Sequence, residues 1–257
     1  MHDVKPTATL ALLFLPLLAV AQTPPATVQP AAATEAPLGP PLRLLAEARQ
    51  AYQSIQDYTC LFVKRERVRG VMQPENVMTM RVRARPFSIY MRWQAPRNLE
   101  GQEACYVAGR NNGMMRVHST GLLGVAGFVS IDPNDPRALQ TSRHTITEAG
   151  IGNLIERYIE RWEVEKKLGR TQVRIADYEF NRRRCVRVEV IHPNSKPGEF
   201  YSYRGVIYFD KQTHLPIRSE AYDWPRPGGP PDGELLECFS YVDLKVNVRL
   251  PANAFDY

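Results

Sequence analysis

Histidines close to acidic residues are the side chains of this sequence whose types and spacing could support catalysis or metal binding. His144 precedes Glu148 by four residues, and His118 and Asp132 flank an apolar stretch. Zinc proteases place two histidines four residues apart around a glutamate, and here the second histidine is absent. A purely structural interpretation is that His144 hydrogen-bonds the chain entering a helix, and that Asp132, which precedes a proline, is a turn residue.

Other catalytic signatures are absent from the sequence. It contains no nucleophile elbow, no phosphate-binding loop and no dinucleotide-binding glycine pattern, and its four cysteines are too widely spaced for a zinc site. We therefore predict neither a metal nor a cofactor. A hydrolase that uses His118 and His144 is the least favoured of three functional hypotheses.

Apolar and aromatic residues are better suited to a ligand cavity or to a core. The stretch from Gly121 to Ile131 is apolar, contains three glycines and has no charge. It is either a buried irregular strand or short helix, or else a mobile apolar lid of a cavity or a membrane-touching loop, and apolar residues are usually buried. The candidates for lining or gating such a cavity are Tyr90, Trp93, Tyr106, Leu122, Leu123, Val125, Phe128 and Trp162. Large aromatics dominate cores in general, so a core role is the alternative for these residues.

The first residues have the pattern of a signal peptide, which we assign to residues 1–21. Lys5 precedes an apolar run from Leu10 to Val20 that ends in small residues before Gln22. The run is shorter than the roughly 20 apolar residues that span a bilayer. A lipoprotein is not expected, because no cysteine follows the predicted cleavage site.

Residues 22–41 are rich in Pro, Ala and Thr and are predicted to be a disordered linker. Residues 42–257 are predicted to form a single domain. Together with the signal peptide, this organisation indicates an exported protein without a transmembrane helix in its mature chain, and it leaves open whether that protein is periplasmic or secreted.

The charge is mildly basic, with 33 Lys+Arg against 27 Asp+Glu and a net charge of +6. The alternating run Arg81-Val82-Arg83-Ala84-Arg85 is typical of a solvated sheet face, and attraction to an anionic membrane surface is the alternative. Nucleic acid is not an expected partner, and the oligomeric state is not indicated. Cys60, Cys105, Cys185 and Cys238 are either disulfide-bonded or buried thiols, and both remain open.

Periodicity predicts two helices, Leu42–Ile55 and Thr147–Leu168, the second capped by Thr145 and Glu148 and ended by Gly169. A tight hairpin is expected at Asn112-Gly113. The predicted strands are Tyr58–Val68, Asn76–Arg83, Ser88–Trp93, Glu103–Ala108, Met114–His118, Val173–Phe180, Arg184–His192, Tyr203–Asp210, Pro216–Asp223 and Leu235–Val248. This order indicates the α+β class, with a strongly curved antiparallel sheet, an incomplete β-barrel, covered by helices.

Several long segments resemble a family known as domain of unknown function 1571. They are YQSIQDYTCLFVKRERVRG, GQEACYVAGRNNGMMRVH, ITEAGIGNLIERYIE and GVIYFDKQTHLPIRSEAYDWP. That family in turn resembles the carrier superfamily of LolA and LolB, in which a curved antiparallel half-barrel closed by helices takes lipoprotein acyl chains. The resemblance implies a LolA-like fold and, as expectations, a lipid or an acylated protein as partner and a periplasmic location, because such carriers work between two membranes.

Three functional hypotheses follow. The first is a non-enzymatic protein that binds an apolar ligand, a lipid or a lipoprotein acyl chain, in a half-barrel cavity. The second is a structural or envelope-interaction protein whose barrel is filled by its own side chains. The third is the hydrolase described above.

Overall fold

The computed structural model describes residues 36–121 and 127–257. The expected signal peptide, most of the expected linker and Leu122, Leu123 and Val125 lie outside the described residues. The described chain contains the α-helices α1 (Gly39–Gln53) and α2 (Ile151–Leu168). Its strands are β1 (Asp57–Val68), β2 (Val71–Met72), β3 (Asn76–Arg83), β4 (Ser88–Ala95), β5 (Glu103–Val107), β6 (Met115–His118), β7 (Val129–Ile131), β8 (Gln172–Phe180), β9 (Arg183–Ile191), β10 (Arg204–Asp210), β11 (Pro216–Tyr222) and β12 (Leu235–Val246).

One antiparallel sheet contains all twelve of these strands, in the order β7-β6-β5-β4-β3-β1-β12-β11-β10-β9-β8, with β2 paired to β1. The first long strand, β1, lies beside the last one, β12, so the two halves of the sheet meet at the β1–β12 seam. Strands β7 and β8 form the edges and do not pair with each other in the described chain, so the sheet stays open. The predicted fold class, an open antiparallel sheet with helices, is confirmed.

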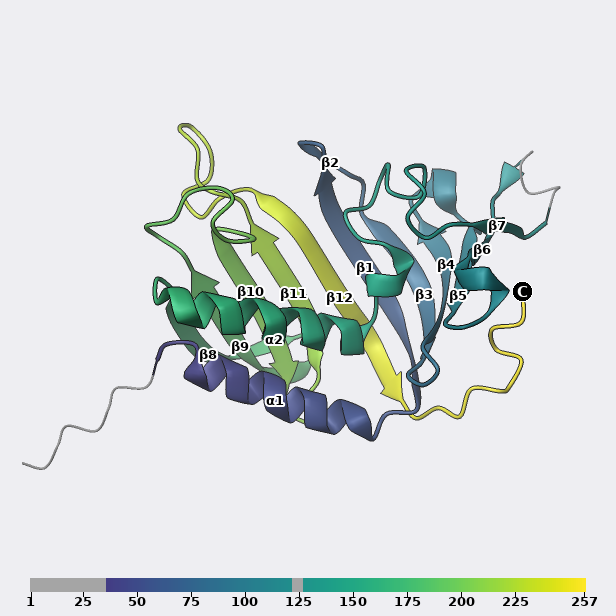
Figure 1. The fold of residues 1–257 in the computed structure, drawn as a ribbon, viewed down its shortest axis with the longest axis horizontal. Coiled ribbons are helices and arrows are strands. Elements are labelled where there is room, and N and C mark those ends of the chain that lie inside the picture. The colour runs from purple at the N-terminus through teal and green to yellow at the C-terminus, as the bar shows by residue number, and fades with distance from the viewer. Residues whose placement is uncertain (1–35, 122–126) are drawn as a thin grey trace, which may run out of the picture. The chain divides into compact units, whose positions relative to one another are not determined.

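Both helices lie on the same face of the sheet, over the half formed by β8–β12 (Figure 1). Their buried residues, such as Leu45 and Ala48 of α1 and Ile155 of α2, share one core with Val188 and Ile207 of the sheet. Burying such side chains contributes about 1.5–3 kcal/mol each. We call this helix-covered face the inner face and the opposite one the outer face.

The outer face of β3–β5 is covered by the last residues of the chain. Phe255 and Ala254 pack against Tyr90 and Cys105 in a second, separate cluster. Arg83, from the arginine run, donates a hydrogen bond of 3.1 Å to the backbone oxygen of Pro251. The other two arginines of the run also contact protein groups. Arg81 lies 5.0 Å from the Tyr90 ring centre, and Arg85 donates hydrogen bonds to the backbone oxygens of Gln53 and Ile55. The run therefore contacts neighbouring parts of the protein.

The structure corrects several details of the predicted elements. Helix α1 begins at Gly39, three residues earlier than expected, with its prolines in the first turn. Thr145 and Glu148 do form a capping box, but it belongs to a separate 3-10 turn, Ile146–Glu148. Helix α2 begins only at Ile151 because Gly150 adopts φ +97°, a value that breaks the helix. Gly169 ends α2 in the left-handed conformation, as predicted.

Two further corrections concern short elements. Strand β2, of two residues, was not predicted, and β7, of three residues, lies at the end of the apolar stretch for which an irregular strand was one of the alternatives. The turn at Asn112-Gly113 is part of a 3-10 turn, Asn111–Gly113, within a longer connection between β5 and β6. All four cysteines are free thiols, and burial raises the pKa of Cys105 to about 12.

Candidate functional site

A cavity of about 370 Å³ lies on the inner face, between the β1–β6 half of the sheet and the segment that precedes α2. We call residues 132–149 the crossing segment. The volume is within the range of small-molecule sites. The strands supply an apolar floor, and the crossing segment supplies a cover that includes Leu139 and Ile146. The apolar floor residues are Phe62, Met91, Trp93, Ala104, Met115, Val117, Phe239 and Tyr241.

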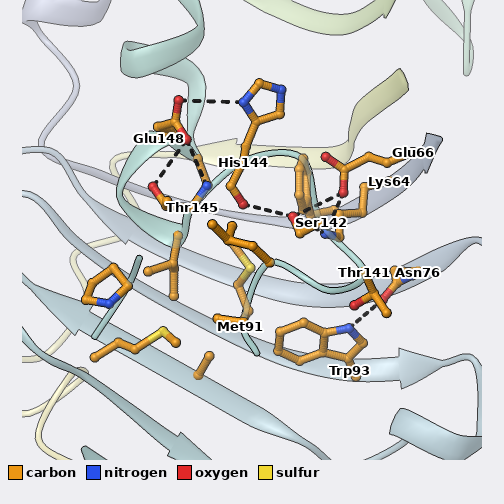
Figure 2. A pocket seen from close by; sticks show the side chains of 18 of the residues that line it. Lys64, Glu66, Asn76, Met91, Trp93, Thr141, Ser142, His144, Thr145 and Glu148 are labelled. Atoms are coloured by element: carbon orange, nitrogen blue, oxygen red, sulfur yellow. Dashed lines mark hydrogen bonds and ion pairs between the residues drawn. The ribbon is translucent and has the colours of Figure 1, made fainter. Parts of the chain in front are cut away.

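Trp93 has the largest ring among the floor residues, and it is one of the cavity candidates identified from the sequence. Its indole nitrogen donates a 2.7 Å hydrogen bond to Asn76, also at the cavity wall (Figure 2). The polar end of the ring is therefore satisfied, and its apolar body is available to a ligand.

A charged corner closes one end of the cavity, at the seam between the two halves of the sheet. Glu66 of β1 and Glu237 of β12 are direct cross-strand partners. Both are buried, with exposed fractions of 2% and 7%. Like charges directly opposite each other destabilise a sheet, so this pair requires compensating cations and hydrogen-bond donors.

The crossing segment supplies most of that compensation. Arg143 donates from its backbone N–H to Glu66 (3.2 Å) and from its guanidinium Nε to Glu237 (3.2 Å). The Ser142 hydroxyl lies 3.2 Å from Glu66 and 2.8 Å from the backbone oxygen of His144. Lys64 of β1 adds an ion pair to Glu66 at 2.8 Å. The two carboxylates therefore hold the crossing segment onto the sheet, and we call this set of contacts the latch.

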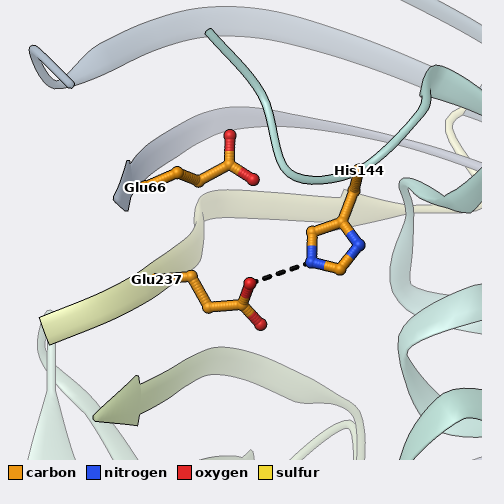
Figure 3. A group of neighbouring side chains, drawn as sticks. All are labelled: Glu66, His144 and Glu237. Atoms are coloured by element: carbon orange, nitrogen blue, oxygen red, sulfur yellow. Dashed lines mark hydrogen bonds and ion pairs between the residues drawn. The ribbon is translucent and has the colours of Figure 1, made fainter. Parts of the chain in front are cut away.

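His144 completes the latch. Its Nε2–H donates to Glu237 at 2.9 Å (Figure 3), and its Nδ1 lies 3.1 Å from the guanidinium of Arg157. With Nε2 as the donor, Nδ1 accepts from Arg157, so both ring nitrogens are engaged. Glu148 lies 3.6 Å from Nδ1 and accepts a hydrogen bond from the backbone N–H of Thr145.

These contacts set the charge of Glu237. Burial opposes its ionisation, but the hydrogen bonds from His144 and Tyr201 and the charge of Arg143 outweigh burial and lower the pKa of Glu237 to about 2. The Tyr201 hydroxyl donates to Glu237 at 2.6 Å. Burial, together with the adjacent carboxylate, in turn raises the pKa of Tyr201. Glu237 is thus an anion at neutral pH, and its hydrogen-bond and ion-pair partners are Arg143, His144 and Tyr201.

Glu66, His144 and Glu237 also bring three potential metal-ligand atoms within 4.8 Å of one another. Carboxylate and imidazole are suitable ligands for zinc and other transition metals. In this structure Lys64 and Arg143 already neutralise the carboxylates, and a metal ion would have to displace both. The cluster is therefore better explained as an anchoring network.

The polar residues singled out from the sequence separate into two groups. His144 and Glu148 both line the cavity. His118 lies on β6 with its ring 5.3 Å from that of Phe128, and exposed Asp132 accepts a 2.8 Å hydrogen bond from the backbone N–H of Asn134, as a turn residue does. Neither borders the cavity.

The aromatic candidates are also divided. Only Trp93 lines the cavity, although Tyr106 packs nearby on the same inner face. Tyr90 stacks on Tyr257 on the outer face, and Phe128 lies 5.2 Å from the same ring. Trp162 belongs to the core under α2, beside a hole of about 20 Å³ that has room for one water molecule.

Sequence reasoning missed Glu66, Glu237, Arg143 and Tyr201. One signal was available for the aromatics: residues of odd and even number on a strand point to opposite faces, so Tyr90 and Trp93 could not share a cavity. The two glutamates gave no such signal, because their proximity depends on pairing between strands far apart in the sequence.

Comparisons with known proteins were made on the sequence and on the fold. The family model described as "Protein of unknown function (DUF1571)" matches residues 55–257, which confirms the predicted family. The search of curated proteins finds no match. No helix in the described ranges is both long and apolar enough to cross a membrane.

Similar folds occur among solved structures, at low sequence identity. An uncharacterised conserved protein from Thermus thermophilus is 9% identical with a TM-score of 0.47, and the match covers 85% of this chain and 93% of that one. The lipoprotein LppX from Mycobacterium tuberculosis is 12% identical with a TM-score of 0.47, covering 82% and 96%. A LolA superfamily protein from Nitrosomonas europaea is 10% identical with a TM-score of 0.32, covering 83% and 96%.

Proposed function

We propose that this chain, which belongs to the DUF1571 family of proteins of unknown function, binds an apolar ligand in the cavity under its crossing segment. The ligand is a lipid or the acyl chain of a lipoprotein, and the protein acts without catalysing a reaction. The observation that carries the proposal is the cavity of about 370 Å³ with an apolar floor. An interior filled by its own side chains, as a purely structural protein would have, is less consistent with such a space.

The charges at the cavity wall support a ligand whose buried part is uncharged. Lys64 pairs with Glu66, Arg157 lies 4.0 Å from Glu148, and Arg137 pairs with Asp135. Because these groups compensate one another, the main attraction for a ligand is burial of apolar surface, at about 25 cal/mol per Å². The affinity is set by the free energy that remains after the entropic costs of association are subtracted.

The cellular setting is part of the same proposal. The signal-peptide pattern of residues 1–21 supports export, and the resemblance to periplasmic carriers is the reason for proposing a periplasmic location. The partners would be a lipid or an acylated protein. Ile131, the last residue of the apolar stretch Gly121–Ile131, lines the cavity, and we propose from the sequence that this stretch is its gate.

The test is native mass spectrometry of the protein purified from its own host, followed by lipid extraction and titration with a fluorescent fatty-acid probe. We expect a co-purifying lipid or acylated peptide and saturable binding of the probe. Ala104→Phe, which fills the cavity floor, should weaken probe binding at least tenfold, whereas Ala176→Phe on the exposed strand β8 should not. A ligand-free mass together with no binding of the probe would contradict the proposal.

A hydrolase is the second candidate, because His144 lies 2.9 Å from a carboxylate at the wall of an accessible cavity. Against it, both nitrogens of His144 are already engaged, so a proton acceptor becomes available only if Arg157 moves away. We expect no turnover of p-nitrophenyl acyl esters. Turnover that His144→Gln abolishes in a folded variant would favour the hydrolase.

A further inference from the structure

We propose that the outer face of the sheet, over strands β8–β12 and β1, docks onto an anionic phospholipid surface. This face is opposite the cavity, so the inference is independent of the ligand proposed above.

The first observation is a row of cross-strand partners that crosses six neighbouring strands. Partners in register point to the same face. The row consists of Arg174, Glu189, Val206, Glu220, Cys238 and Arg65. Because Val188 and Val190 of β9 face the helices, Glu189 and its row face outward. With neighbouring strands about 4.8 Å apart, the row is about 24 Å long.

The second observation is a surplus of positive charge around this row. Arg187, Arg204 and Arg218 lie next to it, since each is two residues from a row member on its strand. Three guanidinium groups converge on one carboxylate, Glu189: Arg187 and Arg204 at 3.0 Å and Arg174 at 3.7 Å. Glu220 has a single arginine, Arg218, at 2.6 Å. The row and these three neighbours together contain five arginines and two glutamates, a net charge of +3, and the one further carboxylate acting on the row member Cys238 that is not in this set belongs to Glu75.

The shape and side chains of the patch favour a bilayer surface over a small anion. Two of its arginines lie over aromatic rings: the guanidinium carbon of Arg204 is 3.8 Å from the Tyr222 ring centre, and that of Arg218 is 5.0 Å from the Phe180 ring centre. Guanidinium groups are well suited to hydrogen-bond phosphate oxygens, and the exposed Arg65 and Arg174 are the ones that headgroups can reach. Tyr178, on the same face and 49% exposed, adds an amphipathic ring of the kind found at membrane interfaces. Such charges are spread over several strands, as contact with many headgroups requires.

Cosedimentation with vesicles tests the proposal. We expect the protein to pellet with vesicles of equal parts phosphatidylglycerol and phosphatidylcholine, to stay in solution with pure phosphatidylcholine, and to be released by salt. The variant Arg65→Ala/Arg174→Ala removes both arginines of the row, which are the most exposed of the five and have the weakest ion pairing. It should lower partitioning at least tenfold. The matched control Lys166→Ala/Lys167→Ala removes two exposed charges from α2 on the other face and should change nothing.

Each other outcome overturns the proposal. If the wild-type protein does not pellet with the anionic vesicles at low salt, the face does not dock on membranes. If both double variants lose binding equally, net charge and not this face is responsible. If the protein binds polyglutamate, but not vesicles, in a manner that Arg65→Ala/Arg174→Ala weakens, the face recognises an acidic protein. Unchanged far-ultraviolet circular dichroism and melting temperature verify that the variants are folded.

Discussion

At the scale of single residues, Glu237 couples the stability of the protein to pH. Its pKa in the folded protein is about 2, below the value of 4.5 for an unperturbed glutamate. A pKa that is lower in the folded than in the unfolded state stabilises the protein at pH values above the unfolded-state pKa. This contribution is lost as the pH falls from about 4.5 to about 2. The shift corresponds to a contribution on the order of 3 kcal/mol at neutral pH.

The variant Glu237→Gln should therefore be less stable than the wild-type protein at pH 7, by about 1–3 kcal/mol, and the difference should shrink at pH 3. Denaturant unfolding at both pH values measures it. Glu163→Gln on the exposed side of α2 serves as the control, and should match the wild type at both. An equal difference at pH 7 and pH 3 for Glu237→Gln would show that the charge of Glu237 is not responsible.

Residue types alone predicted only part of the candidate site. His144 and Glu148 were found because they precede a helix at a recognisable spacing, and Trp93 because it is a large aromatic on a strand. Glu237 was not found, because a glutamate in a strand usually faces water. Glu237 becomes a buried anion that needs partners only because its strand pairs with that of Glu66, which is far away in the sequence.

At the scale of elements, the crossing segment is held to the sheet mainly by the latch. Arg143 links it to both buried glutamates, so Arg143→Met leaves two opposed carboxylates with one cation fewer. We expect a loss of about 1–3 kcal/mol in unfolding free energy and faster amide hydrogen exchange in residues 138–146. Strands β8–β11 should keep their protection, because they do not contact the segment through the latch.

Arg137→Met is the matched control for that prediction. Arg137 lies on the same segment but pairs only with Asp135, two residues away, at the surface. Its loss should leave both stability and hydrogen exchange unchanged, as surface pairs contribute little. Exchange that increases equally in the two variants would mean that the latch does not hold the segment.

Elements were predictable where the local pattern was decisive. Strand β3 has the predicted bounds, because apolar and polar residues alternate through it and turn residues flank it. The beginning of α2 was not predictable in this way, because a capping box normally stands at the start of the helix that follows it. Here Gly150, at φ +97°, separates the capped turn from α2, and the hydroxyl of Tyr58 accepts from the backbone N–H of Ile151 instead. That contact comes from β1, 93 residues earlier.

At the scale of the whole molecule, the β1–β12 seam makes each half of the sheet depend on the other. The first and last long strands pair there, and the latch glutamates, the cavity floor and the core beneath the helices all adjoin this pairing. Neither the position of β12 nor the existence of the cavity follows from local sequence, because both depend on this one long-range pairing. The two halves of a sheet that share such a seam should not unfold independently of each other.

We therefore expect one cooperative unfolding transition. Two variants that each retain one tryptophan, Trp93 in the β1–β7 half or Trp224 beyond β11, should report the same denaturant midpoint, which should also match far-ultraviolet circular dichroism. Phe62→Ala then weakens the seam, because Phe62 packs against Phe239 and Tyr241 of β12, with ring centres 6.0 and 5.1 Å away. It should cost about 3–5 kcal/mol and shift both probes equally. If Trp93 and Trp224 reported different midpoints, or if Phe62→Ala shifted only one of them, the two halves would be separate folding units joined at the seam, and the latch would be a contact between them rather than part of one core.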